Sequence, residues 1–163
     1  DERTRELRQQ IAERERIELR LKHEVVHDAL TGLPNRRYLR DRLERVLARA
    51  RRTPEHGFAV LYLDVDRFKV INDSLGHTVG DAVLKEVAAR LNECVRAPDV
   101  VARLGGDEFA VLLEDLESND TPARVAQRII DALARPIHAA GKELASSASI
   151  GRGFSGNASA GAR

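Results

Sequence analysis

The sequence predicts a mixed α/β domain, and three observations carry that prediction. Residues 58–63 form a near-continuous apolar run, which is typical of a strand buried on both faces. Two further apolar runs, at residues 100–102 and 109–113, flank a glycine-rich turn and predict a hairpin. Amphipathic helical patterns, such as the one at residues 81–95, alternate with these strands. We therefore expect strands and flanking helices within one domain.

Composition limits the class of protein. The chain has 163 residues, enough for one domain and a short appendage. Lys and Arg number 27 against 26 Asp and Glu, and this balance argues against a nucleic-acid binder, which carries a basic excess. Cys94 is the single cysteine, so no disulfide forms within the chain, and we expect a small buried hydrophobe there. Neither a signal-peptide pattern nor a membrane-length apolar run occurs, so we expect a soluble, cytoplasmic protein or a piece of a longer one, with no membrane segment.

Residues 1–27 are helix formers dense in Arg and Glu, without Gly or Pro, and predict one long helix. Four apolar side chains fit one heptad seam: Leu7, Ile11, Leu21 and Val25. Arg14 and Glu18 occupy the middle of that seam, so the pattern fits a marginal coiled coil and also a solvated single helix. Paired in a dimer, this helix would be a rigid connector to an upstream sensor.

The next segment ends the first helix and begins another. Gly32 and Pro34 break the helical pattern, and Asn35 is placed to cap a second helix that runs to about Arg51. One face of this second helix is apolar. It comprises Leu39, Leu43, Val46, Leu47 and Ala50. A loop at residues 53–57 then leads into the buried strand.

The buried strand ends in Asp64-Val65-Asp66. Acids at the end of a central strand suit metal and phosphate chemistry, because strand ends open into the ligand crevice. Residues 67–81 follow as a polar, glycine-bearing loop with a short helical turn, and we expect a helix from Asp81 to about Val95.

The last third of the chain predicts one more helix and two short strands. Thr121 and Pro122 have the residue types that begin helices. Residues 137–150 are expected to form two strands around a turn, and after Gly151 the pattern stops. The chain thus divides into a helical linker at 1–27, a domain at 28–151, and a disordered or foreign tail at 152–163.

The turn Gly105-Gly106-Asp107-Glu108 combines two glycines with two acids. Glycine supplies the φ > 0 backbone of tight turns and leaves room for a phosphate to approach. Asp107 and Glu108 would be presented from a rigid base, which suits a hard divalent cation with its preference for oxygen ligands. Taken alone, the same residues also fit a plain polar hairpin tip.

Four separated segments share the order and spacing of one known family: residues 28–36, 64–69, 72–81 and 105–109. On these motifs the sequence resembles the GGDEF family, the diguanylate cyclases. The resemblance implies a palm-like α/β domain with a mostly antiparallel five-stranded sheet flanked by helices and preceded by a long linker helix. The residues around Thr121 and Ser149-Ile150-Gly151 further resemble copies fused to an EAL phosphodiesterase domain.

The resemblance implies an enzyme that condenses two GTP molecules to cyclic di-GMP and releases two pyrophosphates, with one GTP on each protomer of a homodimer. A ribose 3′-hydroxyl attacks an α-phosphorus, so catalysis is mostly positioning and electrostatics. The resemblance assigns Mg²⁺ or Mn²⁺ to Asp64, the Val65 carbonyl and Asp107. Asp107 would also help to activate the hydroxyl, and Glu108 would support the same site. We expect Asp64 and Asp107 to converge from neighbouring strand ends on one shared cation.

Substrate contacts are also implied by the resemblance. It assigns guanine recognition to Asn72 and Asp81, phosphate contact to Lys69, and a place in the substrate loop to His77. The other expected substrate contacts are Phe68, Gly105 and Gly106. Plainer alternatives remain for three of these residues: Asn72 and Asp81 as helix caps, and His77 as a hydrogen-bonded loop residue.

Arg96-Ala97-Pro98-Asp99 matches the RxxD product-inhibition motif of the family. Arginine forks bind phosphates, and a carboxylate accepts hydrogen bonds from a guanine edge. Arg103 is close enough in sequence to join them. The resulting hypothesis is that cyclic di-GMP binds at Arg96, Asp99 and Arg103 and locks the domain.

The sequence departs from the family pattern after residue 151, where a further helix and an edge strand normally follow. We expect that part to be missing, which would leave a sheet edge uncovered and weaken triphosphate binding. Two functions therefore remain open. One is a Mg²⁺-dependent cyclase that works as a dimer; the other is a catalytically inactive module that binds GTP or cyclic di-GMP and signals through the linker helix. In the full-length protein we expect an upstream sensor domain and a downstream EAL domain.

Overall fold

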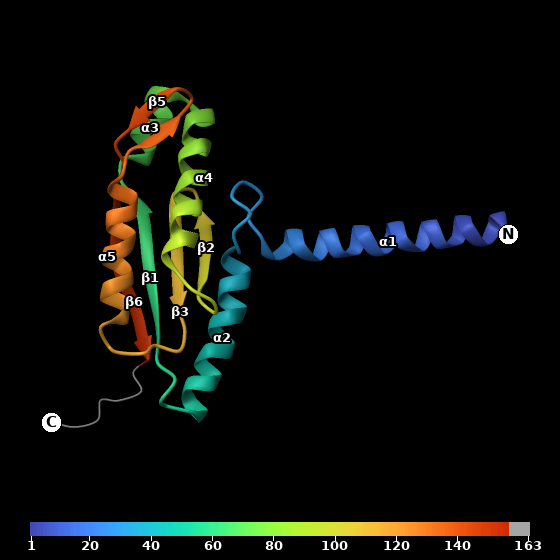
Figure 1. Cartoon of the computed structure of the whole chain (residues 1–163), viewed down its shortest axis with the longest axis horizontal. Coiled ribbons are helices and arrows are strands. Elements are labelled where there is room, and N and C mark those ends of the chain that lie inside the picture. The colour runs from blue at the N-terminus through green and yellow to red at the C-terminus, as the bar shows by residue number, and fades with distance from the viewer. Residues whose placement is uncertain (157–163) are drawn as a thin grey trace.

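The structure is a computed structural model that describes the backbone of residues 1–156 and the side chains of residues 1–151. Its helices are α1 (Glu2–Val26), α2 (Arg36–Arg52), α3 (Phe68–Leu75), α4 (His77–Cys94) and α5 (Thr121–Ala134). Its strands are β1 (Phe58–Val65), β2 (Val100–Gly105), β3 (Glu108–Leu113), β4 (Ile137–Ala139), β5 (Lys142–Leu144) and β6 (Ala148–Gly156). The predicted fold class is confirmed: a long helix leads into a mixed α/β domain (Figure 1).

One antiparallel sheet organises the domain, with strand order β2-β3-β1-β6. The described residues supply four strands to it, whereas the family resemblance implies five; β4 and β5 form a separate hairpin. The predicted hairpin between β2 and β3 is present, and Gly105 and Gly106 at its turn have φ values of 143° and 51°. Both values lie where a side chain is unfavourable, so this turn depends on its glycines.

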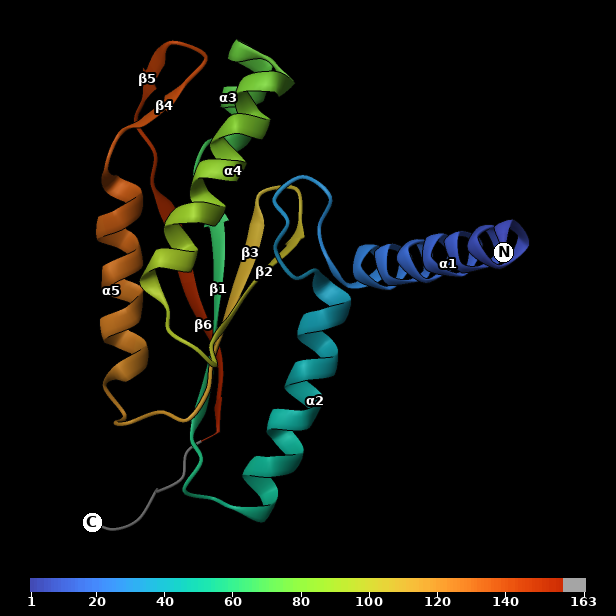
Figure 2. The ribbon, with the colours of Figure 1, turned by 45° about the vertical axis from the view of Figure 1, so that its right-hand side comes forward.

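The two faces of the sheet have separate cores, and alternate residues of β1 point into each. Ala59 and Leu61 pack with α4 and α5, while Phe58 and Val60 pack with α2 on the other face (Figure 2). The prediction that β1 is buried on both faces is confirmed from Phe58 as far as Leu61. It fails at Tyr62, which is 45% exposed, because the cover provided by α2 ends there and a cleft opens beside it.

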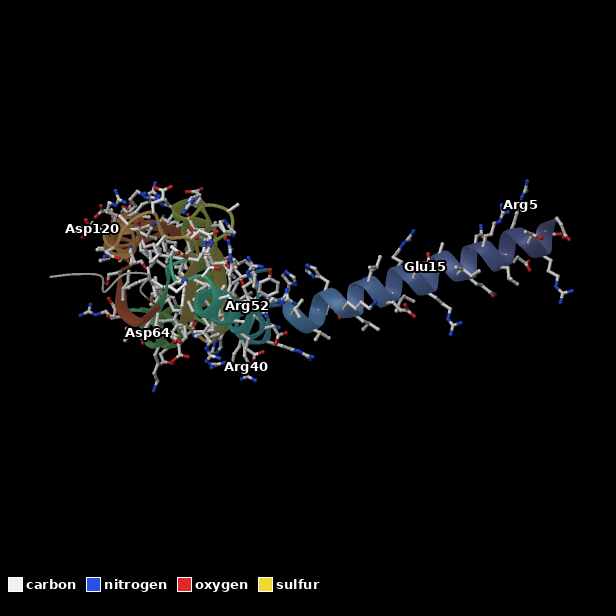
Figure 3. All side chains as sticks on the ribbon, turned by 90° about the horizontal axis from the view of Figure 1, so that it is seen from below. Arg5, Glu15, Arg40, Arg52, Asp64 and Asp120 are labelled. Carbon is white, nitrogen blue, oxygen red and sulfur yellow. The ribbon has the colours of Figure 1, made fainter. Side chains whose placement is uncertain are left out.

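Helix α1 projects away from the domain, and none of its residues is buried (Figures 1 and 3). It is joined to α2 through Asn35, which caps α2 as predicted: its Oδ1 accepts from the Tyr38 amide at 3.1 Å. The Asn35 side chain also donates to the Val25 carbonyl at 2.9 Å, so one residue connects the end of α1 to the start of α2. Within residues 1–156, no helix has both the length and the apolar content that crossing a membrane requires.

The predicted loop at residues 67–81 is instead a pair of helices. α3 and α4 are separated by Gly76 alone, at φ 90°, and α4 begins at His77 instead of Asp81. Phe68, Ile71 and Leu75 pack against the core at helical spacing, which the polar residues between them concealed in the sequence. His77 therefore lies in the first turn of a helix, and its predicted loop position is wrong.

The chain beyond Gly151 continues the sheet. β6 extends to Gly156, and its backbone pairs with β1 as far as Phe58. The prediction of a disordered tail is therefore wrong for residues 152–156, where the ladder with β1 satisfies backbone groups whatever the side chains are. Residues 157–163, the rest of the predicted tail, lie outside the described residues.

Candidate functional site

Acids from two neighbouring strands meet at one end of the sheet. Asp64 is the last residue but one of β1, and its register partner across the sheet is Glu108, the first residue of β3. The amide of Val65 donates to the carbonyl of Asp107 at 3.2 Å, which fixes the turn of the hairpin against the end of β1. Asp64 and Asp107 thus lie side by side, as the sequence predicted.

The pKa of Asp64 is raised to about 6, and the largest cause is a hydrogen bond between the carboxyl groups of Asp64 and Asp107. Burial and the negative charges of Asp107, Glu108 and Asp66 contribute to the same shift in smaller measure. A shift of this direction means that negative charge is crowded at the site, and a divalent cation relieves such crowding. The oxygen donors fit a hard cation such as Mg²⁺. Beyond this pair, the described side chains include no group of three or more His, Cys, Asp or Glu residues placed to hold a metal.

A cleft of about 400 Å³ lies beside these acids. Its walls include Asp64, Glu108, Tyr62 and Ser149, and also Arg36 from the first turn of α2. Arg36 was not among the site residues predicted from the sequence. Within the described part of the chain, its guanidinium has no hydrogen bond or ion pair, so its charge is available to an anion in the cleft.

Asp66, the second acid after β1, has a different role. It accepts hydrogen bonds from the hydroxyls of Ser147 at 2.7 Å and Ser149 at 2.6 Å, which lower its pKa. These bonds attach the start of β6 to the end of β1. Of the two aspartates in this motif, Asp64 remains available for a ligand, whereas Asp66 is committed to the fold.

The residues expected to recognise guanine lie on the two helices after β1. Asn72 is on α3, and its Oδ1 is buried without a hydrogen-bond partner among the described groups. It faces Gly80 on α4, where a Cβ atom would collide with this oxygen. Asp81 is the next residue and is exposed. A buried acceptor without a partner is costly, so Asn72 is suited to receive a donor from a ligand.

Three other expected substrate residues surround this helix pair. Lys69 is exposed on α3, and His77 is exposed at the start of α4. Phe68 is partly buried and packs against the core, and its ring tip lies 3.4 Å from the position that a Cβ atom on Gly80 would take. Lys69 and His77 are therefore accessible to a ligand, while Phe68 supports the position of α3.

Arg103 does not join Arg96 and Asp99, and that prediction is wrong. Its Nη1 lies 3.1 Å from both carboxylate oxygens of Asp28, and its Nε and Nη2 donate to the Gly106 carbonyl at 3.0 and 2.8 Å. Burial raises the pKa of Asp28, but hydrogen bonds from Thr31 and Arg103 outweigh it and hold that pKa below its usual value. Arg103 is thus occupied at the hairpin turn, at the far end of β2.

Arg96 and Asp99 form a tight turn after α4. The Arg96 amide donates to Asp99 Oδ2 at 3.3 Å, and Asp99 Oδ1 accepts from the Glu114 amide at 3.1 Å. The turn borders a cleft of about 280 Å³, and two arginines from α5, Arg124 and Arg128, line the same cleft. Neither arginine was predicted to belong to this site, although their i,i+4 spacing on one helix was a usable signal.

Comparisons with curated proteins identify the relatives of this chain. Residues 25–160 match the family described as diguanylate cyclase, GGDEF domain. The diguanylate cyclase TpbB of Pseudomonas aeruginosa is 48% identical over 132 residues, which are 80% of this chain and 30% of TpbB. The bifunctional diguanylate cyclase and cyclic di-GMP phosphodiesterase MucR of the same organism is 46% identical over 140 residues, 86% of this chain and 19% of MucR. The chain thus spans less than a third of the length of either relative.

Solved structures agree with the family. The GGDEF domain of TpbB has a TM-score of 0.74 at 48% identity, with 77% of this chain and 73% of that chain covered. The coiled coil and GGDEF domain of DgcB from Caulobacter crescentus, solved with cyclic di-GMP, has a TM-score of 0.78 at 29% identity, with 90% and 79% covered. The chain therefore belongs to the GGDEF-domain family of diguanylate cyclases.

Proposed function

We propose that this domain is one half of a diguanylate cyclase, which joins its GTP to a second GTP held by a partner protomer. The contact between the Asp64 and Asp107 carboxyl groups carries the proposal, because two crowded acids beside a cleft suit a metal-bound triphosphate. The names of relatives such as TpbB support the same activity.

In this proposal each residue has a defined role. Asp64, Asp107 and the Val65 carbonyl hold Mg²⁺ or Mn²⁺, which when bound offsets charge that develops on the phosphoryl oxygens. Asp107 helps to take the proton of the attacking 3′-hydroxyl, and Glu108 supports the pair from the opposite strand. Gly105 and Gly106 carry no side chains, so that the reacting groups can approach this part of the turn.

Substrate recognition is proposed for the helix pair α3 and α4. The unpaired Oδ1 of Asn72 accepts from the guanine edge, and the exposed carboxylate of Asp81 accepts from it as well. Lys69 and His77 are accessible to the phosphates and the ribose, and Phe68 positions α3.

Pairing and feedback are proposed from two further features. Leu7, Ile11, Leu21 and Val25 are each about half exposed on α1, which supports pairing of two α1 helices in a homodimer. Arg96 and Asp99 border a cleft that two α5 arginines also line, which supports inhibition by cyclic di-GMP there without Arg103.

An upstream sensor and a downstream EAL domain remain predictions. MucR is a relative named for both diguanylate cyclase and cyclic di-GMP phosphodiesterase activity.

Incubation of the protein with GTP and Mg²⁺, followed by chromatographic detection of cyclic di-GMP, tests the proposed activity. We expect product from the unchanged protein and its loss, by about a hundredfold or more, in Asp107→Asn. Glu143→Gln, an exposed acid on β5, is the matched control and should retain full activity. Absence of product from a folded, dimeric, GTP-binding protein would instead favour the regulatory module.

The regulatory alternative has support of its own. The segment between α1 and α2 is hydrogen-bonded both to α1 and to the turn. The Asn35 side chain donates to the Val25 carbonyl, the Arg103 amide donates to the Pro34 carbonyl, and the Arg103 side chain binds Asp28 and the Gly106 carbonyl. A ligand that alters the turn would therefore act on the base of α1. Tight binding of GTP or cyclic di-GMP without turnover is the result that distinguishes this function.

A further inference from the structure

Two histidines lie one helical turn apart at the end of α1, in the sequence His23-Glu24-Val25-Val26-His27. Their rings are stacked, with centroids 3.7 Å apart and planes within 3° of parallel. His23 is exposed and His27 is partly exposed at the helix end. Neither residue has a role in the proposed cyclase.

The hydrogen bonding of His27 determines which nitrogen is free. Its Nδ1 lies 3.0 Å from the carbonyl oxygen of His23. Because a carbonyl only accepts hydrogen bonds, Nδ1 of the neutral ring carries the proton, and Nε2 presents a lone pair. Metal-binding histidines are commonly oriented in this way, with one ring nitrogen donating to a backbone carbonyl and the other bound to the ion.

The four-residue spacing of His23 and His27 allows both side chains to reach one ion. Two nitrogens bound to one tetrahedral Zn²⁺ at 2.0–2.1 Å lie about 3.3 Å apart. In the stacked arrangement the lone pairs of the two rings lie in parallel planes and do not converge, so both side chains must rotate about χ1 and χ2 to bind one ion. His23 is exposed and His27 is partly exposed, which leaves room for that rotation. Histidines at i and i+4 on one helix face recur in zinc sites for the same geometric reason.

We propose that His23 and His27 form a binding site for a divalent transition-metal ion of the Zn²⁺ type at the junction between α1 and the domain. Imidazole ligands select Zn²⁺, Ni²⁺ or Cu²⁺, whereas Mg²⁺ prefers the oxygen ligands of the acidic site. Water fills the remaining coordination positions. The site is thus distinct in chemistry and in place from that of Asp64 and Asp107.

The site lies where α1 is attached to the domain. His27 pairs with Pro34 in an isolated bridge, and the carbonyl of the preceding residue, Val26, accepts from the Asn35 amide at 2.9 Å. An ion held by His23 and His27 would connect the last turn of α1 to the residue that ends it. Metal binding is therefore expected to slow amide hydrogen exchange in this last turn.

Titration of the full chain with Zn²⁺ by calorimetry, in the presence of excess Mg²⁺, tests the site. We expect His23→Ala or His27→Ala to weaken Zn²⁺ binding about tenfold or more. His138→Ala, which removes an exposed histidine from β4, should leave binding unchanged. Retention of wild-type Zn²⁺ affinity by the His23→Ala/His27→Ala double variant would overturn the proposal.

A register variant separates geometry from histidine content. Val25→His combined with His27→Val keeps the number of histidines but moves the second one to i+2, on another side of the helix. Circular dichroism establishes that the helix is retained. This variant should lose binding as the single variants do; Zn²⁺ affinity equal to that of the unchanged protein would contradict the proposed i,i+4 site.

Discussion

Arg103 donates from its Nη1 to both carboxylate oxygens of Asp28 at 3.1 Å, although the two residues are 75 positions apart in the sequence. The same guanidinium donates to the carbonyl of Gly106 through Nε and Nη2. One side chain therefore ties the segment after α1 to the turn that carries Asp107. The position of the acidic pair depends on this connection.

Replacement of Arg103 should disturb the turn more than the fold. Arg103→Ala removes partly buried hydrogen bonds to a charged group and is expected to cost about 1.5–3 kcal/mol in the free energy of unfolding. Cyclic di-GMP synthesis should fall about tenfold or more, because Asp107 is no longer held in place. Urea unfolding and a turnover assay measure the two effects. Arg135→Ala, at an exposed arginine beyond α5, is the control, and equal effects of the two substitutions would contradict this role.

The acidic pair should destabilise the metal-free protein at neutral pH. The pKa of Asp64 is raised, so its charged form is disfavoured by folding, and the resulting loss of stability sets in as pH rises from about 4 to about 6. Asp64→Asn removes this penalty. In EDTA, the variant should be more stable than the unchanged protein at pH 7.5, by no more than about 1 kcal/mol because the site is exposed and screened. The difference should vanish near pH 4. A difference that grew toward low pH would contradict the assignment.

Gly80 should be required for guanine recognition. A methyl group at this position would collide with Oδ1 of Asn72, so Gly80→Ala displaces the amide that we assign to the base. GTP binding is expected to weaken about tenfold, with a smaller effect on inorganic triphosphate. Isothermal titration with both ligands measures this. Equal weakening for both ligands would show that the helix pair had shifted as a whole, against a specific role of Asn72.

Arg36 should contribute positive charge to the cleft. Arg36→Ala is expected to raise KM for GTP about three- to tenfold, because an unpaired guanidinium no longer faces the triphosphate. Arg52→Ala, at the exposed C-terminal end of α2, is the matched control (Figure 3). If both variants raise KM equally, the change in KM comes from the lower net charge of the protein and not from the loss of a contact in the cleft.

The sequence predicted the parts of the fold that depend on side-chain pattern. Apolar runs located β1 and β3, and the glycines located the turn, so the juxtaposition of Asp64 and Asp107 followed from the pairing of adjacent strands. The extension of β6 to Gly156 was not predictable from pattern, because backbone hydrogen bonds to β1 form it and its small residues leave no periodic signal.

Contacts between segments distant in the chain could not be predicted from the sequence either. Arg103 was expected beside Arg96 because the two are close in the chain, but β2 runs between them and places them at opposite ends. The commitment of Asp66 to Ser147 and Ser149 depends on the same long-range pairing of β1 with β6. Motif spacing predicted which residues are chemically suited to the site, and only the fold distinguished available side chains from occupied ones.

Mn²⁺ binding in the presence of GTP is the most direct test of the cation that we propose Asp64 and Asp107 share. Electron paramagnetic resonance counts the bound Mn²⁺ in the unchanged protein, in Asp64→Asn, in Asp107→Asn and in the control Glu143→Gln. We expect bound metal in the unchanged protein and the control, and its loss in both aspartate variants. Undiminished Mn²⁺ binding in either aspartate variant would contradict a cation shared by the two strand ends.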